Sequence, residues 1–366
     1  MRSAYILKNS QYAYMQTMVS IFAGELIKPE KIQVIARESL ENILQLSVFK
    51  SLANDYQQPI EYNHQHLPAG VIENSLKKIL FSEAIKIIRS LQPIDRNFLN
   101  YWMCRFELQN IKSIIRGKYL CYENDQIRAS LIPLEHFTYL SIDKILHQED
   151  INEILKYLED TPYALISRYA LQHFEQKNDV FSIEASISHQ FYEGLNRRRY
   201  QFDRNNQNAI HQLLGLIIDQ INLITLIRYR LYYGFSAAQT YFHLFSGGLH
   251  LYQQYLQKLS EIESFNQVVD YLPEPYQSLL AQAQSIQEIE IILDQNLIEQ
   301  AYALIKKTRF SVAQAFTYLI LREKQLSQLH GIIKGKILGL NQDAIDMALG
   351  NQLTIASLMG KQTGER

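Results

Sequence analysis

The sequence predicts an all-α protein, because turn-forming residues are scarce and apolar residues recur at helical spacing. Only 14 of the 366 residues are glycine and 8 are proline, which is about half the usual share. Valine and threonine are also scarce, whereas leucine, isoleucine, glutamine and glutamate are plentiful. Since a sheet needs β-branched residues and frequent turns while a helix needs neither, this composition favours helices along the whole chain.

Charge and hydropathy exclude several classes of function. The formal net charge is -1, from 36 basic and 37 acidic residues, so no basic excess is available to hold a nucleic acid. No uninterrupted apolar run approaches the roughly 18 residues that cross a bilayer, and residues 1–5 do not begin a signal peptide. Two cysteines, Cys104 and Cys121, cannot form a disulfide framework. We therefore expect a cytoplasmic protein without direct lipid insertion, held at a membrane only through a partner.

Three twelve-residue segments align without gaps. Each starts with an acid or amide, continues with Asn or Gln three residues later and an aliphatic residue after that, and ends in two bases separated by one residue. The segments are residues 107–118, 219–230 and 325–336. The polar pairs are Glu107 and Asn110, Asp219 and Asn222, and Gln325 and Gln328. The basic pairs are Arg116 and Lys118, Arg228 and Arg230, and Lys334 and Lys336.

A second repeated feature lies upstream of each segment. It is an Ile-Glu pair followed by two apolar residues at helical spacing. The glutamates of the three pairs are Glu73, Glu184 and Glu290. These glutamates precede the first residue of the corresponding segment by 34, 35 and 35 residues. Chance similarity would not keep this interval three times, so the chain contains an internal repeat with a period of 106 to 112 residues.

Each segment has the spacing of a helix. In the first, Leu108, Ile111 and Ile115 lie on one stripe, and the other two segments follow the same pattern. The bases fall at the C-terminal end, where cations offset the exposed carbonyl groups of a helix. Prolines and glycines punctuate the chain between segments. These features predict three helical bundles at residues 12–125, 126–236 and 237–345, with an N-terminal lead-in at 1–11 and a polar tail at 346–366.

Two interpretations of the repeated polar residues remain open. An acid and an amide three residues apart share one helix face, where they can bond to each other or to a neighbouring helix. Their recurrence favours an architectural role, whereas a ligand-binding role is the alternative. The basic pairs are either solvated helix ends or a set of contacts to an acidic partner surface. No phosphate-binding loop or zinc-type cluster is present, so we expect neither a cofactor nor a metal.

The repeated segment resembles a known family, the C subunit of archaeal and bacterial V/A-type ATPases, equivalent to the d subunit of the vacuolar ATPase. The resemblance is carried by residues 110–112 with Arg-Gly-Lys at 116–118, by residues 318–323 with Lys-Gly-Lys at 334–336, and by Tyr-Ala-Tyr at 12–14. The sequence departs from the family pattern at Gln325, Gln328 and Tyr229-Arg230.

The resemblance implies three bundles related by a pseudo-threefold axis and forming a funnel. It also implies a non-catalytic central-stalk subunit whose partners are the axle subunits and the proteolipid ring. Two rivals are an all-α enzyme and a cytosolic helical scaffold unrelated to rotary ATPases. The sequence lacks the aspartate-rich cluster that an isoprenoid-type enzyme uses to hold magnesium, so the scaffold is the stronger rival.

Overall fold

The computed structural model describes residues 2–46, 69–134, 136–177 and 180–350, so most of the predicted tail, residues 351–366, lies outside it. Within the described ranges the secondary structure consists of helices, with no strand. The all-α prediction is therefore confirmed. The chain divides into two compact units. We call residues 91–282 the central unit, and residues 1–90 together with 283–366 the terminal unit.

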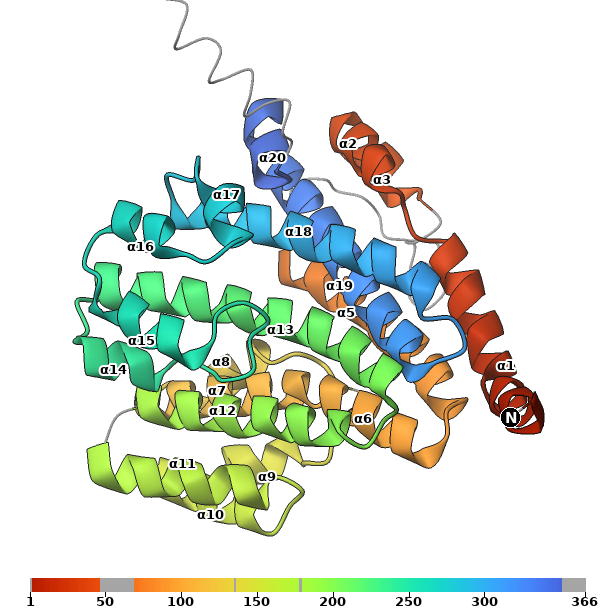
Figure 1. Ribbon diagram of the computed structural model, residues 1–366. Helices are drawn as coiled ribbons and strands as arrows, with labels where there is room; N and C mark the ends of the chain where they lie inside the picture. The colour runs from red at the N-terminus through yellow and green to blue at the C-terminus, as the bar shows by residue number, and fades with distance from the viewer. Residues whose placement is uncertain (1, 47–68, 135, 178–179, 351–366) are drawn as a thin grey trace, which may run out of the picture. The chain divides into compact units, whose positions relative to one another are not determined.

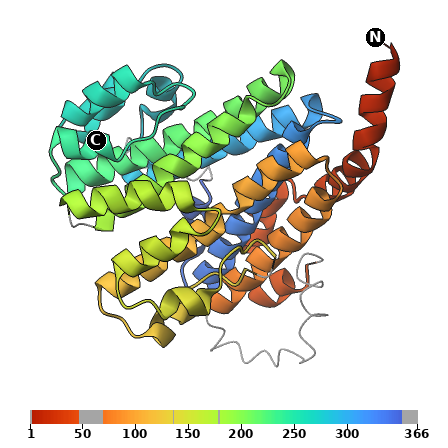
Figure 2. The same ribbon diagram turned by 90° about the horizontal axis from the view of Figure 1, so that it is seen from below.

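The central unit contains two of the predicted motif helices, α7 and α13. Its helices are α6 (Pro93–Met103), α7 (Arg105–Tyr119), α8 (Asn124–Ala129), α9 (Ile142–Leu146), α10 (Ile151–Glu159), α11 (Ala164–Lys177), α12 (Val180–Arg199), α13 (Arg204–Leu226), the π-helical η1 (Ile227–Tyr232), α14 (Ala237–Phe242), α15 (Gln253–Glu261), α16 (Phe265–Tyr271) and α17 (Tyr276–Leu280). Helix α7 packs against α6, α8, α10 and α12, and α13 packs against α12, α14 and α15 (Figure 1). Helices α11 and α12 lie side by side in both views (Figure 2).

The terminal unit is built around the third motif helix. Its helices are α1 (Arg2–Gly24), α2 (Pro29–Arg37), α3 (Leu40–Leu44), α5 (Ala69–Arg89), α18 (Ile286–Lys307), α19 (Val312–Ile337) and α20 (Gln342–Ala348). Helix α19 contacts every other helix of this unit. The two ends of the described chain therefore share one core, whose fully buried members include Met15, Ile87, Phe316 and Tyr318.

Local sequence explains where many of these helices begin. Side-chain oxygens of Ser141, Asp150, Asp203, Ser311 and Asn341 each accept a hydrogen bond from the backbone N–H three residues later. This bond satisfies one of the amides that a helix start leaves unpaired. Helices α2 and α6 instead begin with a proline, whose missing N–H costs nothing at that position.

The three motif helices end in the same way. A residue with positive φ follows each helix, namely Cys121 at 56°, Gly234 at 69° and Gly339 at 66°. The next residue donates its N–H back into the last turn, at 2.9 Å in all three cases: Tyr122 to Gly117, Phe235 to Tyr229, and Leu340 to Gly335. The middle return bond spans six residues instead of five, because η1 inserts one extra residue before the turn.

The helix formed by α13 and η1, Arg204–Tyr232, is the one helix in the described part of the chain that is long and apolar enough to cross a membrane by length and composition. Its mean hydropathy reaches 1.5, and 61% of its most apolar stretch is buried inside the protein. Asp219 and Asn222 interrupt its apolar residues, so a search for uninterrupted runs overlooks it. Because both polar residues bond within the central unit, the helix is the core helix of that unit.

Candidate functional site

The first motif acid, Glu107, holds a loop of its own chain. Its Oε1 accepts hydrogen bonds from Thr138 Oγ1 at 2.7 Å and from the backbone N–H groups of Tyr139 at 2.9 Å and Leu140 at 3.0 Å. Its Oε2 accepts a second bond from Tyr139 N at 3.1 Å and one from Tyr163 Oη at 2.5 Å. These donors occupy the lone pairs of a buried carboxylate.

The first motif amide, Asn110, lies one turn further along α7. Its Nδ2 donates to the backbone carbonyl of Ile132 at 2.8 Å, and its Oδ1 accepts from the backbone N–H of the same residue at 2.8 Å. A single side chain thus pairs with both backbone groups of a buried loop residue, as a neighbouring strand would.

The second motif acid, Asp219, repeats the arrangement of the first. Its carboxylate accepts from the backbone N–H groups of Leu249 at 3.1 Å, His250 at 2.8 Å and Leu251 at 3.1 Å. Tyr276 Oη donates to the same carboxylate at 2.9 Å. Burial raises the pKa of Asp219 to about 6, against the opposing effect of these four hydrogen bonds.

The second motif amide, Asn222, is fully buried. It donates to the carbonyl of Phe245 at 2.8 Å and accepts from the N–H of Phe245 at 2.7 Å. The residue clamped by each amide lies 22 or 23 positions downstream, and the tyrosine on each acid lies 56 or 57 positions downstream. The first two motifs therefore have the same construction: in each, the acid and the amide bind backbone groups of downstream loops instead of each other, and the acid also accepts from a tyrosine hydroxyl.

The third motif uses different partners. Gln325 is buried, donates to the carbonyl of Ile27 at 3.0 Å and accepts from Arg322 Nη1 at 2.7 Å. A carboxylate cannot donate, so an amide is the side chain that can meet both partners. Gln328, which aligns with Asn110 and Asn222 in the sequence, is partly exposed.

A buried ion pair supports the third motif. Arg322 donates to Glu83 through Nε at 2.9 Å and Nη2 at 2.7 Å, and Tyr318 Oη donates to the same carboxylate at 2.6 Å. The side chains of Arg322 and Glu83 are 4% and 8% exposed. No sequence pattern indicates this pair, because Glu83 and Arg322 are 239 residues apart and neither belongs to a repeated position.

The basic pairs of the central unit are largely engaged within the chain. Arg116 forms a bidentate ion pair with Glu184, with distances of 2.7 and 2.8 Å from Nη2. Lys118 donates to the carbonyl of Leu146 at 2.8 Å. Arg230 donates to the carbonyl of Phe235 at 2.9 Å and to Glu263 at 2.6 Å.

The remaining bases differ in exposure. Arg228 and Lys334 are exposed, and Lys336 is half-buried. In the terminal unit the pKa of Glu73 is lowered mainly by its hydrogen bond to Lys77, with a smaller contribution from the charge of Lys334. Arg116 of the first motif helix thus lies near Glu184, and Lys334 of the third lies near Glu73. Both glutamates belong to the repeated Ile-Glu pairs.

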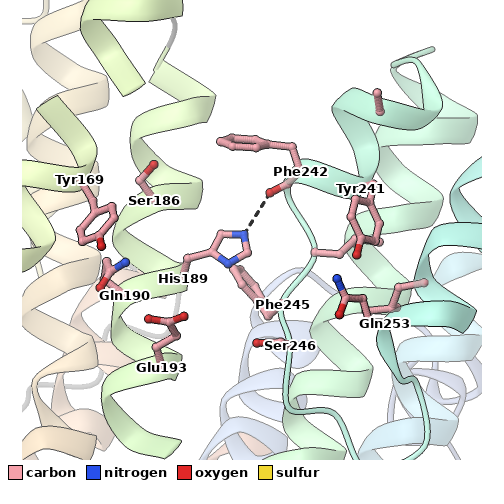
Figure 3. A pocket seen from close by; sticks show the side chains of 13 residues that line it. Tyr169, Ser186, His189, Gln190, Glu193, Tyr241, Phe242, Phe245, Ser246 and Gln253 are labelled. Carbon is pink, nitrogen blue, oxygen red and sulfur yellow. Dashed lines mark hydrogen bonds between the residues drawn. The ribbon is translucent and has the colours of Figure 1, made fainter. Parts of the chain in front are cut away.

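A cleft of about 660 Å³ lies in the central unit. Figure 3 shows Tyr169, His189 and Gln190 of α11 and α12 on one side, facing Phe242 and Tyr241 of α14 on the other. His189 Nε2 donates to the carbonyl of Phe242 at 3.0 Å across it. No sequence pattern indicates this cleft, since its lining is spread over residues 169–256 and follows no motif.

Among the described residues, no group of three or more His, Cys, Asp or Glu side chains is placed to hold a metal ion. The motif carboxylates bind backbone amides and tyrosine hydroxyls, so their geometry is that of loop anchors. An arrangement of this kind fixes the path of the chain after each motif helix.

Comparison with known proteins identifies one family along most of the chain. The pattern of the ATP synthase (C/AC39) subunit family matches residues 15–347. The chain is 23% identical over 350 residues to the C subunit of the A-type ATP synthase of Methanocaldococcus jannaschii, covering 93% of this chain and 86% of the relative. The corresponding subunit of Methanosarcina barkeri is 24% identical over 342 residues, covering 92% of both chains. That of Methanococcoides burtonii is 23% identical over 354 residues, covering 95% of both. Because the family pattern spans all three motif helices, the chain belongs to the ATP synthase (C/AC39) subunit family of rotary ATPases.

Proposed function

We propose that this chain is a non-catalytic central-stalk subunit that seats the axle of a rotary ATPase on the proteolipid ring. In this role it transmits torque between ATP synthesis or hydrolysis and the transport of protons or sodium ions. The observation that carries the proposal is the family match over residues 15–347, together with relatives named as the C subunit of A-type ATP synthases.

The proposed architecture consists of three related bundles, at residues 12–125, 126–236 and 237–345, arranged as a funnel around a common axis. Two observations support it. The acid and amide of the first two motifs anchor loops at matching sequence distances, and all three motif helices end in a positive-φ residue with a return hydrogen bond. A torque-bearing part also benefits from stiffness, which such loop anchors supply.

The absence of catalysis is part of the proposal. Glu107 and Asp219 are saturated with hydrogen bonds from their own loops, which leaves them poorly suited to act as general bases. The sequence contains no phosphate-binding loop. We expect the purified chain to hydrolyse no ATP.

Attachment to the membrane is proposed to occur through protein contacts on the cytoplasmic side, without lipid insertion and without nucleic acid. The partial burial of the helix Arg204–Tyr232 supports this part of the proposal, because 61% of its most apolar stretch is already buried inside the protein. The exposed bases Arg116, Arg228 and Lys334 remain candidates for contacts to axle or ring.

Co-purification tests the proposed role against the rival scaffold function. The chain, tagged at its N-terminus, is isolated from native membranes in a mild detergent, and its partners are identified and counted by mass spectrometry. A socket subunit should be recovered in one copy with axle subunits and proteolipid. Recovery without either of them would support a scaffold outside the rotary ATPase.

A further inference from the structure

The cleft of the central unit is held in shape by hydrogen bonds within that unit. Its volume of about 660 Å³ lies within the range of small-molecule sites, roughly 300–1,000 Å³. On one wall Asn222 clamps both backbone groups of Phe245, and His189 of the other wall donates to the carbonyl of Phe242 across the cleft (Figure 3). Because these bonds fix the walls, a ligand meets a cleft that is already formed.

An amide without a partner lies on the α12 wall of the cleft. Gln190 is only 9% exposed, yet its side-chain amide makes no hydrogen bond to any other described residue. Buried side-chain amides are usually paired. Since this amide lines the cleft, a ligand with a hydrogen-bonding group can pair with it there.

A carboxylate lies one helical turn further along the same wall. Glu193 follows Gln190 by three residues, a spacing that places both side chains on one face of α12. The carboxylate forms an exposed ion pair with Arg197 at 3.2 Å, and such pairs contribute little to stability. No lysine or arginine is among the described residues that line the cleft. This wall therefore presents oxygen acceptors and a negative charge, which a cationic group with N–H donors matches.

The opposite wall suits an apolar body. It is formed by α14, α15 and the loop between them, and most of its described lining residues are aromatic or aliphatic: Ala238, Tyr241, Phe242, Leu244, Phe245 and Leu256. Aromatic rings also attract cations to their faces. A ligand that matches both walls combines an apolar body with one positive group.

We propose that this cleft binds an organic cation, an ammonium or guanidinium group on a short apolar body, with Gln190 and Glu193 as its polar contacts. The cation is either a free amine or a basic side chain of a partner protein, and both present the same chemistry to the cleft. The inference rests on the geometry of the central unit and does not depend on the proposed rotary function.

Titration calorimetry with the full-length chain tests the proposal. The probes are phenethylamine, its anionic counterpart 3-phenylpropionate, and the blocked dipeptide acetyl-phenylalanyl-arginine amide. Each probe is titrated into the wild type and into Gln190→Leu, Glu193→Gln and Arg197→Gln. Glu261→Gln, the same change as Glu193→Gln at an exposed residue of α15 outside the lining, is the matched control. Circular dichroism checks that each variant keeps its helical content and thermal midpoint.

We expect both cations to bind and 3-phenylpropionate not to bind. Gln190→Leu should weaken cation binding at least about tenfold, since it removes a hydrogen bond to a charged group. Glu193→Gln should weaken it about two- to fivefold, because this carboxylate is 52% exposed. Arg197→Gln should strengthen it by a similar factor, because the carboxylate loses its competing partner. Glu261→Gln should bind like the wild type.

The two cations distinguish the sources of the ligand. Tighter binding of phenethylamine supports a free amine, and tighter binding of the dipeptide supports a basic side chain of a partner protein. The inference is overturned if 3-phenylpropionate binds as tightly as phenethylamine, if neither cation binds, or if neither Gln190→Leu nor Glu193→Gln weakens cation binding. These outcomes leave the proposed rotary function intact.

Discussion

Replacing Asn222 by alanine removes a clamp from the core of the central unit. The amide of Asn222 satisfies both the N–H and the carbonyl of Phe245, at 2.7 and 2.8 Å, and the side chain of Asn222 is itself fully buried. After Asn222→Ala both backbone groups lose their partner. Leaving a buried polar group unpaired costs roughly 1–3 kcal/mol.

The cleft beside Phe245 limits the cost. Phe245 lines this cleft, so a water molecule can reach part of the freed backbone. Two unpaired backbone groups would together cost about 2–6 kcal/mol. Because water can pair with part of one of them, we expect Asn222→Ala to lower the free energy of unfolding by the lower half of this range, about 2–4 kcal/mol. The equivalent change at Asn110 should have a similar effect, because its clamp on Ile132 has the same geometry.

Two measurements check this prediction. Urea unfolding followed by circular dichroism gives the stability change, and hydrogen exchange with mass spectrometry reports on the amide of Phe245, which should exchange faster in the variant. Asn205→Ala, an exposed position on the same helix α13, is the control and should stay within about 0.5 kcal/mol of the wild type. A stability change below about 0.5 kcal/mol for Asn222→Ala, with unchanged exchange at Phe245, would refute the clamp.

The same structure makes three further predictions. The pKa of Asp219 in the folded protein is about 6, above its ordinary value of 3.8. Its contribution to the free energy of unfolding is therefore present at low pH and is lost as the pH rises from about 4 to 6. Asp219→Asn should thus lower the free energy of unfolding more at pH 4 than at pH 7, measured by urea unfolding at both pH values. Glu83→Ala leaves the buried guanidinium of Arg322 without its carboxylate and should lower the free energy of unfolding by about 3–5 kcal/mol. Asp143→Ala, which breaks the exposed ion pair with Arg128, should lower it by less than about 1 kcal/mol. Equal midpoints of the two variants in thermal unfolding would contradict this. Gly215→Ala would place a Cβ 2.9 Å from the backbone of Leu249 and should destabilise the folded protein by about 1–3 kcal/mol. The Cβ of Gly331→Ala would meet no atom within 4 Å, so this variant should stabilise the folded protein by up to about 1 kcal/mol.

The motif helices could be predicted from the sequence because their information is local. Apolar spacing and two basic residues near the end lie close together along the chain in each motif, and a glycine follows the second and third motif helices. The loops that Asn110 and Asn222 clamp carry no such pattern, since a loop bound through its backbone places little demand on its side chains. The two tyrosines that bond to the acids, Tyr163 and Tyr276, do carry a signal, because their distances of 56 and 57 residues match across the repeat.

The partners of the third motif could not be predicted from the sequence. Gln325 bonds to Ile27, 298 residues earlier in the chain, so no window around the motif contains its partner. The extra residue in η1 is similarly hidden, because it shifts the spacing after the second motif by one and resembles an ordinary length difference between repeats. Contacts of this kind depend on which distant segments share a core, and that is decided by the packing of the whole unit.

The central claim is that this subunit links the axle to the ring mechanically, and the most direct test measures coupling. Membrane vesicles from cells lacking the chain, with the other ATPase subunits added back, are supplied with ATP while hydrolysis and ion uptake are recorded together. Without the chain we expect hydrolysis by the catalytic part but no ion gradient, and we expect the purified chain to restore ion uptake. Ion uptake at the wild-type rate in vesicles without the chain would contradict the account.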